Sequence, residues 1–172
     1  MPTFNDLTSL FNYIENVIIT DCLQKEVYET VKEVEKRHIE KDVYDAYQPT
    51  VYNLADGMPA RRRGKDGGLI ADENIVGEVI GDTLSVKNKT IAAPHYVDFF
   101  LGEIVDSKNK GKPLAPMIEE GGGPNYDFPD PTRKYYYPRP FTKNTYEELK
   151  NTEEHVVAFK KGLKRLGVKV SK

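Results

Sequence analysis

The feature that most constrains this chain is its N-terminal stretch, residues 3–47, which contains neither glycine nor proline. Its apolar residues recur at spacings of three and four: Leu7, Leu10, Phe11, Ile14, Val17, Ile18, Val27, Val31 and Val34. This spacing is that of one face of an α-helix. It predicts one long helix, or two helices with a bend near the polar pair Thr20-Asp21. We expect the helix to end by Pro49, because the residue before a proline is pushed out of the helical region.

The middle of the chain favours a β-hairpin after a loop. Residues 48–68 are rich in glycine and arginine, which indicates a loop. The apolar residues of 75–80 and the alternation of 84–86 are typical of strands, and Gly81-Asp82 between them suits a tight turn. The sequence therefore predicts a hairpin centred on residues 81–82.

The second half of the chain predicts little regular structure before a final helix. Pro94 opens the apolar run 96–101, which we interpret as a short helix or the approach to one, since proline is favourable in a first helical turn. Residues 107–134 hold many glycines and prolines and are expected to be irregular, ending in the β-prone run 135–137.

The last helix is predicted from its caps and its apolar spacing. Asn144 with Glu147 three residues later resembles a capping box, and Gly167 suits the position after a helix end. The expected core face is spaced by helical periodicity: Leu149, Val156, Phe159, Leu163 and Leu166.

These elements predict an α+β fold in one domain spanning residues 1–172. A small, mostly antiparallel sheet would pack against the long N-terminal helix and the C-terminal helix, with long irregular loops at about 48–68 and 107–134. Helices and hairpins that follow one another without strand–helix–strand alternation support this class.

Composition excludes several functional classes. The chain has 172 residues, a net charge of −2 and one cysteine, Cys22, which leaves no disulfide framework or cysteine-rich zinc site. No apolar run is long enough to cross a membrane, and the N-terminus does not read as a secretory signal. The near-neutral charge argues against a generally basic nucleic-acid binder.

No catalytic motif stands out either. His38, His95 and His155 are far apart in the sequence, and no nucleophile elbow of the Gly-x-Ser-x-Gly type is present. Paired acids such as Asp42/Asp45 are best interpreted as solvated helix surface. We therefore expect no catalytic residue, no metal site and no cofactor, and we expect the protein not to be an enzyme.

Two groups of residues are candidates for contact with a subunit or with DNA: Arg61, Arg62, Arg63 and Lys65 in the first loop, and Tyr135, Tyr136 and Tyr137. Consecutive arginines must face water, a carboxylate or a phosphate, because an unpaired buried charge is costly. Tyrosine is enriched at protein interfaces, but it also stacks on bases. A nucleic-acid-binding protein that uses the basic loop 61–65 and surface tyrosines therefore remains the alternative.

The order of elements resembles that of the neck proteins of long-tailed bacteriophages, the head–tail joining or tail-completion family. Four phrases are similar to stretches of that family: residues 43–52 at the helix exit, Gly67-Gly68-Leu69-Ile70 with Asn74-Ile75 at the hairpin entry, residues 93–99, and Arg139-Pro140-Phe141.

The resemblance implies a structural virion protein that forms a ring in the phage neck and joins the DNA-filled head to the tail. It implies a homo-oligomer whose partners are portal, adaptor or stopper-type neck proteins and tail proteins, with passing contact to viral DNA and none to a membrane. It also implies assembly in the host cytoplasm and a final location in the virion. A ring needs two different patches on each copy, and the acidic N-terminal helix and the basic loop 61–65 or basic last helix are candidates for them.

Overall fold

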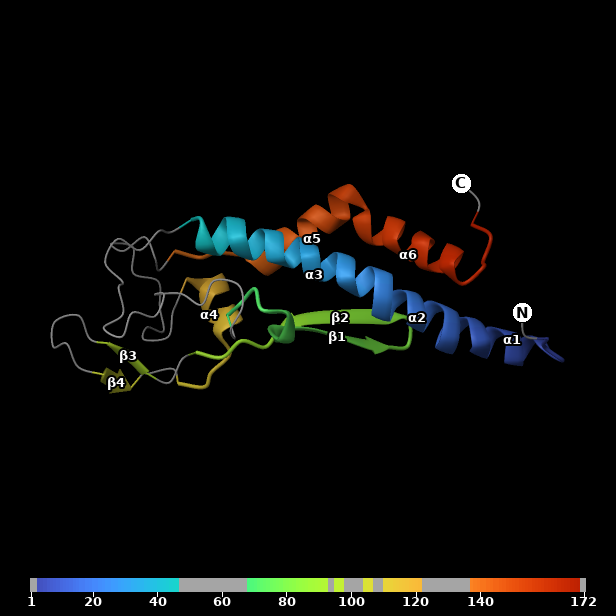
Figure 1. The fold of residues 1–172 in the computed structure, drawn as a ribbon, viewed down its shortest axis with the longest axis horizontal. Helices are drawn as coiled ribbons and strands as arrows, with labels where there is room; N and C mark the ends of the chain where they lie inside the picture. The colour runs from blue at the N-terminus through green and yellow to red at the C-terminus, as the bar shows by residue number, and fades with distance from the viewer. Residues whose placement is uncertain are drawn as a thin grey trace. The chain divides into compact units, whose positions relative to one another are not determined.

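The fold is α+β and mostly helical, as the sequence predicts (Figure 1). The computed structural model describes residues 3–46, 68–92, 95–97, 104–106, 110–121 and 137–170. Within these residues the strands form two antiparallel pairs, β1 with β2 and β3 with β4. The long-loop predictions fall largely outside the described residues, which include only residue 68 of the first loop and 110–121 of the second.

The N-terminal helix runs without interruption from Leu7 to Tyr44. Standard α-helical and wider π-helical turns alternate along it: α1 (Leu7–Tyr13), η1 (Ile14–Ile19), α2 (Thr20–Cys22), η2 (Leu23–Val27), α3 (Tyr28–His38) and η3 (Ile39–Tyr44). Asp6 caps its start by accepting a 2.8 Å hydrogen bond from the Ser9 amide. The helix does not stop at Thr20, whose hydroxyl donates to the Glu15 carbonyl at 3.0 Å. The single-helix alternative is therefore the correct one.

The chain divides into two compact units. Unit 1 comprises Met1–Val34, Gly77–Lys87 and Tyr146–Lys172, and unit 2 comprises Glu35–Val76 and Asn88–Thr145.

In unit 1, helix α6 (Glu154–Arg165) packs against α2 and η2 (Figure 1). The contact is close because two small residues of α6, Ala158 and Gly162, are buried there, with Gly162 directly over the fully buried Cys22. The hairpin of β1 (Ile75–Ile80) and β2 (Thr83–Asn88) confirms the prediction, and Gly81 takes the positive φ of 63° that its turn requires. The Tyr28 ring lies on Gly77, where a Cβ would be 2.5 Å from it.

Unit 2 has its own apolar core, whose buried side chains come from several elements: Ile39, Val43, Tyr44, Leu69, Ala71, Ile75, Ala92, Ala115, Ile118 and Phe141. A short 3₁₀ turn, η4 (Asp72–Asn74), leads into β1. The Asn88 side-chain amide donates to the Leu69 carbonyl at 2.7 Å, and the Leu114 amide donates to the Thr90 carbonyl at 2.7 Å. Hydrogen bonds to the backbone thus hold the irregular segments of this unit around its core.

Two segments of this region differ from the elements expected from the sequence. The sequence predicts a short helix or the approach to one over 96–101, and the structure describes only residues 96 and 97 of this run. These two lie in strand β3 (His95–Val97), which pairs with β4 (Ile104–Asp106) in the register His95↔Asp106. Tyr96 and the β-branched Val97 are residues that favour a strand.

The expected irregular segment 107–134 contains a helix, α4 (Leu114–Glu120). Pro116 is tolerated because it lies in the first turn, where the backbone N–H has no partner within the helix. Gly121 ends the helix with a φ of 88°.

The predicted C-terminal helix is two helices, α5 (Phe141–Thr152) and α6, separated at Glu153 with a φ of 55°. Asn144 is not the N-cap, because α5 begins three residues earlier at Phe141. The side chain of Glu119 caps the first turn of α5 by accepting a 2.5 Å hydrogen bond from the Thr142 amide.

The end of α6 confirms the prediction for Gly167, which has a φ of 79°. The Val168 amide donates to the Leu163 carbonyl at 2.9 Å and the Gly167 amide to the Lys164 carbonyl at 3.0 Å, the two bonds of a Schellman motif. The expected core face is only half-buried, at Leu149, Val156, Phe159, Leu163 and Leu166. Small residues make the closest contact instead, because they let the helix backbones approach.

Candidate functional site

Most of the contact residues predicted from the sequence lie outside the described residues: Arg61, Arg62, Arg63, Lys65, Tyr135 and Tyr136. Tyr137 is described, and it lies at a bend before Pro138, outside any strand, with 47% of its surface exposed. The contact roles of all seven residues stay predictions.

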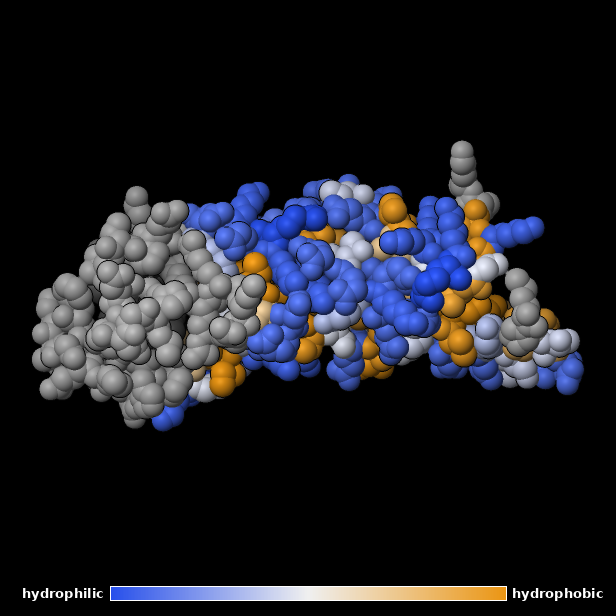
Figure 2. All heavy atoms as spheres, in the orientation of Figure 1, coloured by the Kyte–Doolittle hydropathy of each residue, from blue (hydrophilic) through white to orange (hydrophobic). Residues whose placement is uncertain are grey.

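An exposed apolar surface covers the start of the N-terminal helix. No residue of α1 or η1 is buried, and Leu7, Phe11 and Val17 are 70%, 58% and 46% exposed. Helical periodicity joins them to half-buried neighbours in one stripe, here named the N-terminal face: Leu7, Leu10, Phe11, Ile14, Val17 and Ile18. Figure 2 shows apolar atoms gathered over this part of the helix. A contiguous exposed apolar surface is typical of an interaction site.

A second, chemically different surface lies on the outer side of α6. Val157 is 65% exposed, and lysines at helical spacing surround it. We name this surface the lysine face: Val157, Lys160, Lys161 and Lys164. Within the described part of the chain, none of its three lysines forms an ion pair with an acidic side chain.

The lysine face borders an open hollow of about 550 Å³ between α6 and residues 25–30. Its lining mixes charges of both signs with apolar atoms: Lys25, Glu26, Glu29, Thr30, Glu154, Val157, Ala158 and Lys161. This mixture selects no single class of ligand.

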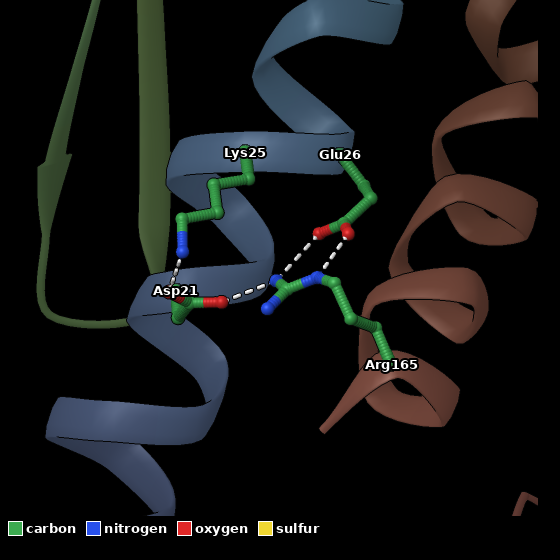
Figure 3. Close-up of polar contacts among 4 residues, drawn as sticks. All are labelled: Asp21, Lys25, Glu26 and Arg165. Carbon is green, nitrogen blue, oxygen red and sulfur yellow. Dashed lines mark hydrogen bonds and ion pairs between the residues drawn. The ribbon is translucent and has the colours of Figure 1, made fainter. Parts of the chain in front are cut away.

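A charged cluster fixes α6 in position (Figure 3). The Arg165 guanidinium donates to Glu26 through Nε at 2.5 Å and Nη2 at 3.0 Å, and it also binds Asp21. Lys25 pairs with the other Asp21 oxygen at 2.6 Å. These bonds lower the pKa of Asp21, chiefly through Lys25, and the pKa of Glu26, chiefly through Arg165.

The cluster changes how the sequence should be interpreted. The acidic N-terminal helix and the basic last helix were candidates for complementary patches on different copies. Arg165 shows that they pair in part within one chain. Glu15 beside the N-terminal face and the lysines of the lysine face take no part in this cluster.

Unit 2 contains a group of buried polar side chains that the sequence did not single out. Glu35 is 4% exposed, with the Asn88 amide 3.5 Å from its carboxylate. Burial raises the pKa of Glu35 to about 6; the Asn88 hydrogen bond opposes this shift and the Glu119 carboxylate adds to it.

His38 and Asp42, which the sequence suggested as an isolated histidine and a solvated acid, belong to the same unit. His38 Nδ1 lies 2.7 Å from Asp42 Oδ2, which also accepts a 2.8 Å hydrogen bond from the Asn144 amide. The spacing of four residues between His38 and Asp42 was the available signal, since such pairs meet on a helix. The network ties the end of the N-terminal helix to the start of α5 and needs no substrate to explain it.

The described residues contain neither a metal-ligand cluster nor a membrane-spanning helix. No group of three or more histidine, cysteine, aspartate or glutamate side chains there could hold a metal ion. None of the described helices is long and apolar enough to span a bilayer.

The chain resembles one known protein family over nearly its whole length. The model of the YomN family matches residues 6–165, from the Asp6 cap of the first helix to Arg165 at the end of α6. No curated protein matches the sequence, and no solved structure matches the fold. The match includes both the N-terminal face and the lysine face.

Proposed function

The chain belongs to the YomN family, a phage-type family, and from this premise we propose that it is a structural virion protein. It forms a ring in the phage neck that joins the DNA-filled head to the tail. In this role the protein has no catalytic residue and requires no cofactor. It assembles in the host cytoplasm and ends in the virion.

The observation that supports this proposal best is the exposed N-terminal face. Isolated helical segments of this length are marginal in water and are normally stabilised by covering their apolar side. Residues 7–18 have no buried side chain, although their apolar spacing is as regular as that of the covered part of the helix. A surface of this kind suits a protein whose final structure includes neighbouring subunits.

A ring in the neck has partners on several sides. Its copies contact one another, and its two rims contact portal, adaptor or stopper-type proteins and tail proteins. The basic residues 61–65 and the tyrosines 135–137 are our candidates for contacts with these partners or with passing DNA. Paired with acidic side chains of a neighbour, the arginines let DNA slide past without tight binding.

The proposal is tested in a phage that encodes this chain. Deleting its gene should leave DNA-filled heads and complete tails that do not join, and supplying the chain from a plasmid should restore joined particles. Mass spectrometry should detect the chain in purified wild-type particles, and antibody labelling should place it at the neck. If the chain is absent from purified particles, or if the deletion yields normal ones, the proposal is wrong.

A further inference from the structure

We infer that the N-terminal face of one copy docks on the lysine face of a neighbouring copy. This inference rests on the proposed assembly of identical subunits and names the surfaces by which they meet. The occupant of each surface is thus a second copy of this chain.

The first argument is that the two surfaces are complementary in charge. Residues 3–19 contain two acids, Asp6 and Glu15, and no base. Helical periodicity places these acids on opposite sides of the N-terminal face. Residues 158–164 contain three bases and no acid, and Lys160 and Lys161 flank the line from Val157 to Lys164. The N-terminal face, with an acid on each side, can therefore pack on Val157 of the lysine face, where lysines lie beside the valine.

The second argument is that one chain cannot satisfy both surfaces. The N-terminal face and the lysine face belong to the same compact unit, and both are exposed in it at once. Arg165 and the close approach of Gly162 hold α6 against α2 and η2, which leaves the lysine face pointing outward. A neighbouring copy can supply what the chain itself does not.

The third argument concerns the kind of contact. Two N-terminal faces would bring Asp6 and Glu15 of both copies together, and like charges across an interface are costly. Pairing unlike faces avoids this repulsion. Each copy then offers one face of each kind, which is a heterologous contact, and repeated heterologous contacts close into a ring when the rotation allows it.

Site-directed cross-linking tests the inference. The variants Phe11→Cys and Val157→Cys are purified separately, mixed, and treated with a short bis-maleimide reagent. The native Cys22 is fully buried, so the wild-type chain serves as the control for its reactivity. We expect a covalent dimer in the mixture and little in either variant alone.

A matched control and a charge reversal sharpen the result. Ile80→Cys replaces a residue of unit 1 that is 68% exposed and outside both faces, and mixed with Val157→Cys it should give no dimer. Changing Lys160, Lys161 and Lys164 to glutamate in the Val157→Cys chain should lower the dimer yield about tenfold or more. Adding Glu15→Lys to the Phe11→Cys partner should restore part of it.

Two outcomes overturn the inference. A dimer formed by Phe11→Cys alone as readily as in the mixture would show that N-terminal faces pair with each other. A mixture that gives no dimer up to the solubility limit would show that the two faces do not meet. The neck proposal is tested separately, by whether the chain is present in virions. If the chain is found at the neck but this cross-link does not form, only the docking inference is wrong. If the cross-link forms but the chain is absent from virions, only the neck role is wrong.

Discussion

Replacing Gly162 by alanine tests how closely α6 lies against the N-terminal helix. A Cβ at this position would be 2.8 Å from Cys22 Sγ, 3.1 Å from Cys22 Cβ and 2.7 Å from Glu26 Oε2. Cys22 is fully buried, and the Glu26 carboxylate is held by Arg165. The added methyl group must therefore push the helices apart or break this ion pair.

Two effects of opposite sign determine the result. In a helix interior, alanine is more favourable than glycine by about 1 kcal/mol. Overpacking a close contact costs about 1–3 kcal/mol. Since two of the three contacts at Gly162 would be shorter than 3.0 Å, we take the upper part of that range. The expected net change is a loss of about 1–2 kcal/mol in the free energy of unfolding.

Urea unfolding followed by far-ultraviolet circular dichroism measures this change. Lys160→Ala, an exposed substitution on the same helix, is the control and should stay within about 0.5 kcal/mol of wild type. In a Cys22→Ala background, which removes the nearest sulfur, the cost of Gly162→Ala should fall by about 1 kcal/mol. If Gly162→Ala instead stabilises the protein by about the propensity difference, α6 does not approach Cys22 as described.

Three further substitutions probe other contacts. Gly77→Ala should destabilise by about 1–2 kcal/mol in urea unfolding, because its Cβ would lie 2.5 Å from the Tyr28 ring; an unchanged midpoint would contradict that packing. The pKa of Glu35 is about 6 in the folded protein and 4.5 ordinarily. Ionisation of Glu35 therefore lowers the free energy of unfolding by about 2 kcal/mol above pH 6, and below about pH 4.5, where Glu35 is protonated in both states, it has no effect. Stability should therefore rise as pH falls through this window, and Glu35→Gln should abolish that rise and be more stable at pH 8. Asp42→Ala should cost about 1–3 kcal/mol by removing the 2.7 Å partner of the buried His38, whereas equal melting of Asp42→Ala and Asp42→Asn would show that the acceptor does not matter.

The parts of the fold that follow from short-range rules could be predicted from the sequence. The absence of glycine and proline in 3–47 predicts the long helix, and Gly81 and Gly167 mark a hairpin turn and a helix end where a positive φ is needed. Each of these features depends on residues within a few positions of one another, so no knowledge of distant contacts is required.

The parts that depend on distant contacts could not be predicted. Asn144 looks like a helix cap, but α5 begins at Phe141, and its first turn is capped by Glu119, which lies 23 residues before the Thr142 amide that it binds. Glu35 and Asp42 look like solvated acids, because nothing local indicates that Asn88 and Asn144 will reach them. The break at Glu153 is similar, since glutamate is ordinarily a good helix former and here takes a φ of 55°.

The N-terminal helix has the same apolar spacing on both sides of Thr20-Asp21, but its apolar residues are covered on one side and exposed on the other. This difference in burial is the strongest reason to look for a partner outside the chain. From Cys22 onward the face is covered, with Val27 at 6% exposure and Val34 fully buried. Before Thr20 the same pattern is left in water, with Leu7 and Phe11 more than half exposed. If the helix served only to pack α6 against Cys22, apolar residues in its first turns would add no stability. Polar residues there would make the protein more soluble. The pattern of residues 7–18 is therefore best understood as an interface whose other half lies on another molecule, and the lysine face of a second copy is the surface of this chain whose charge complements it.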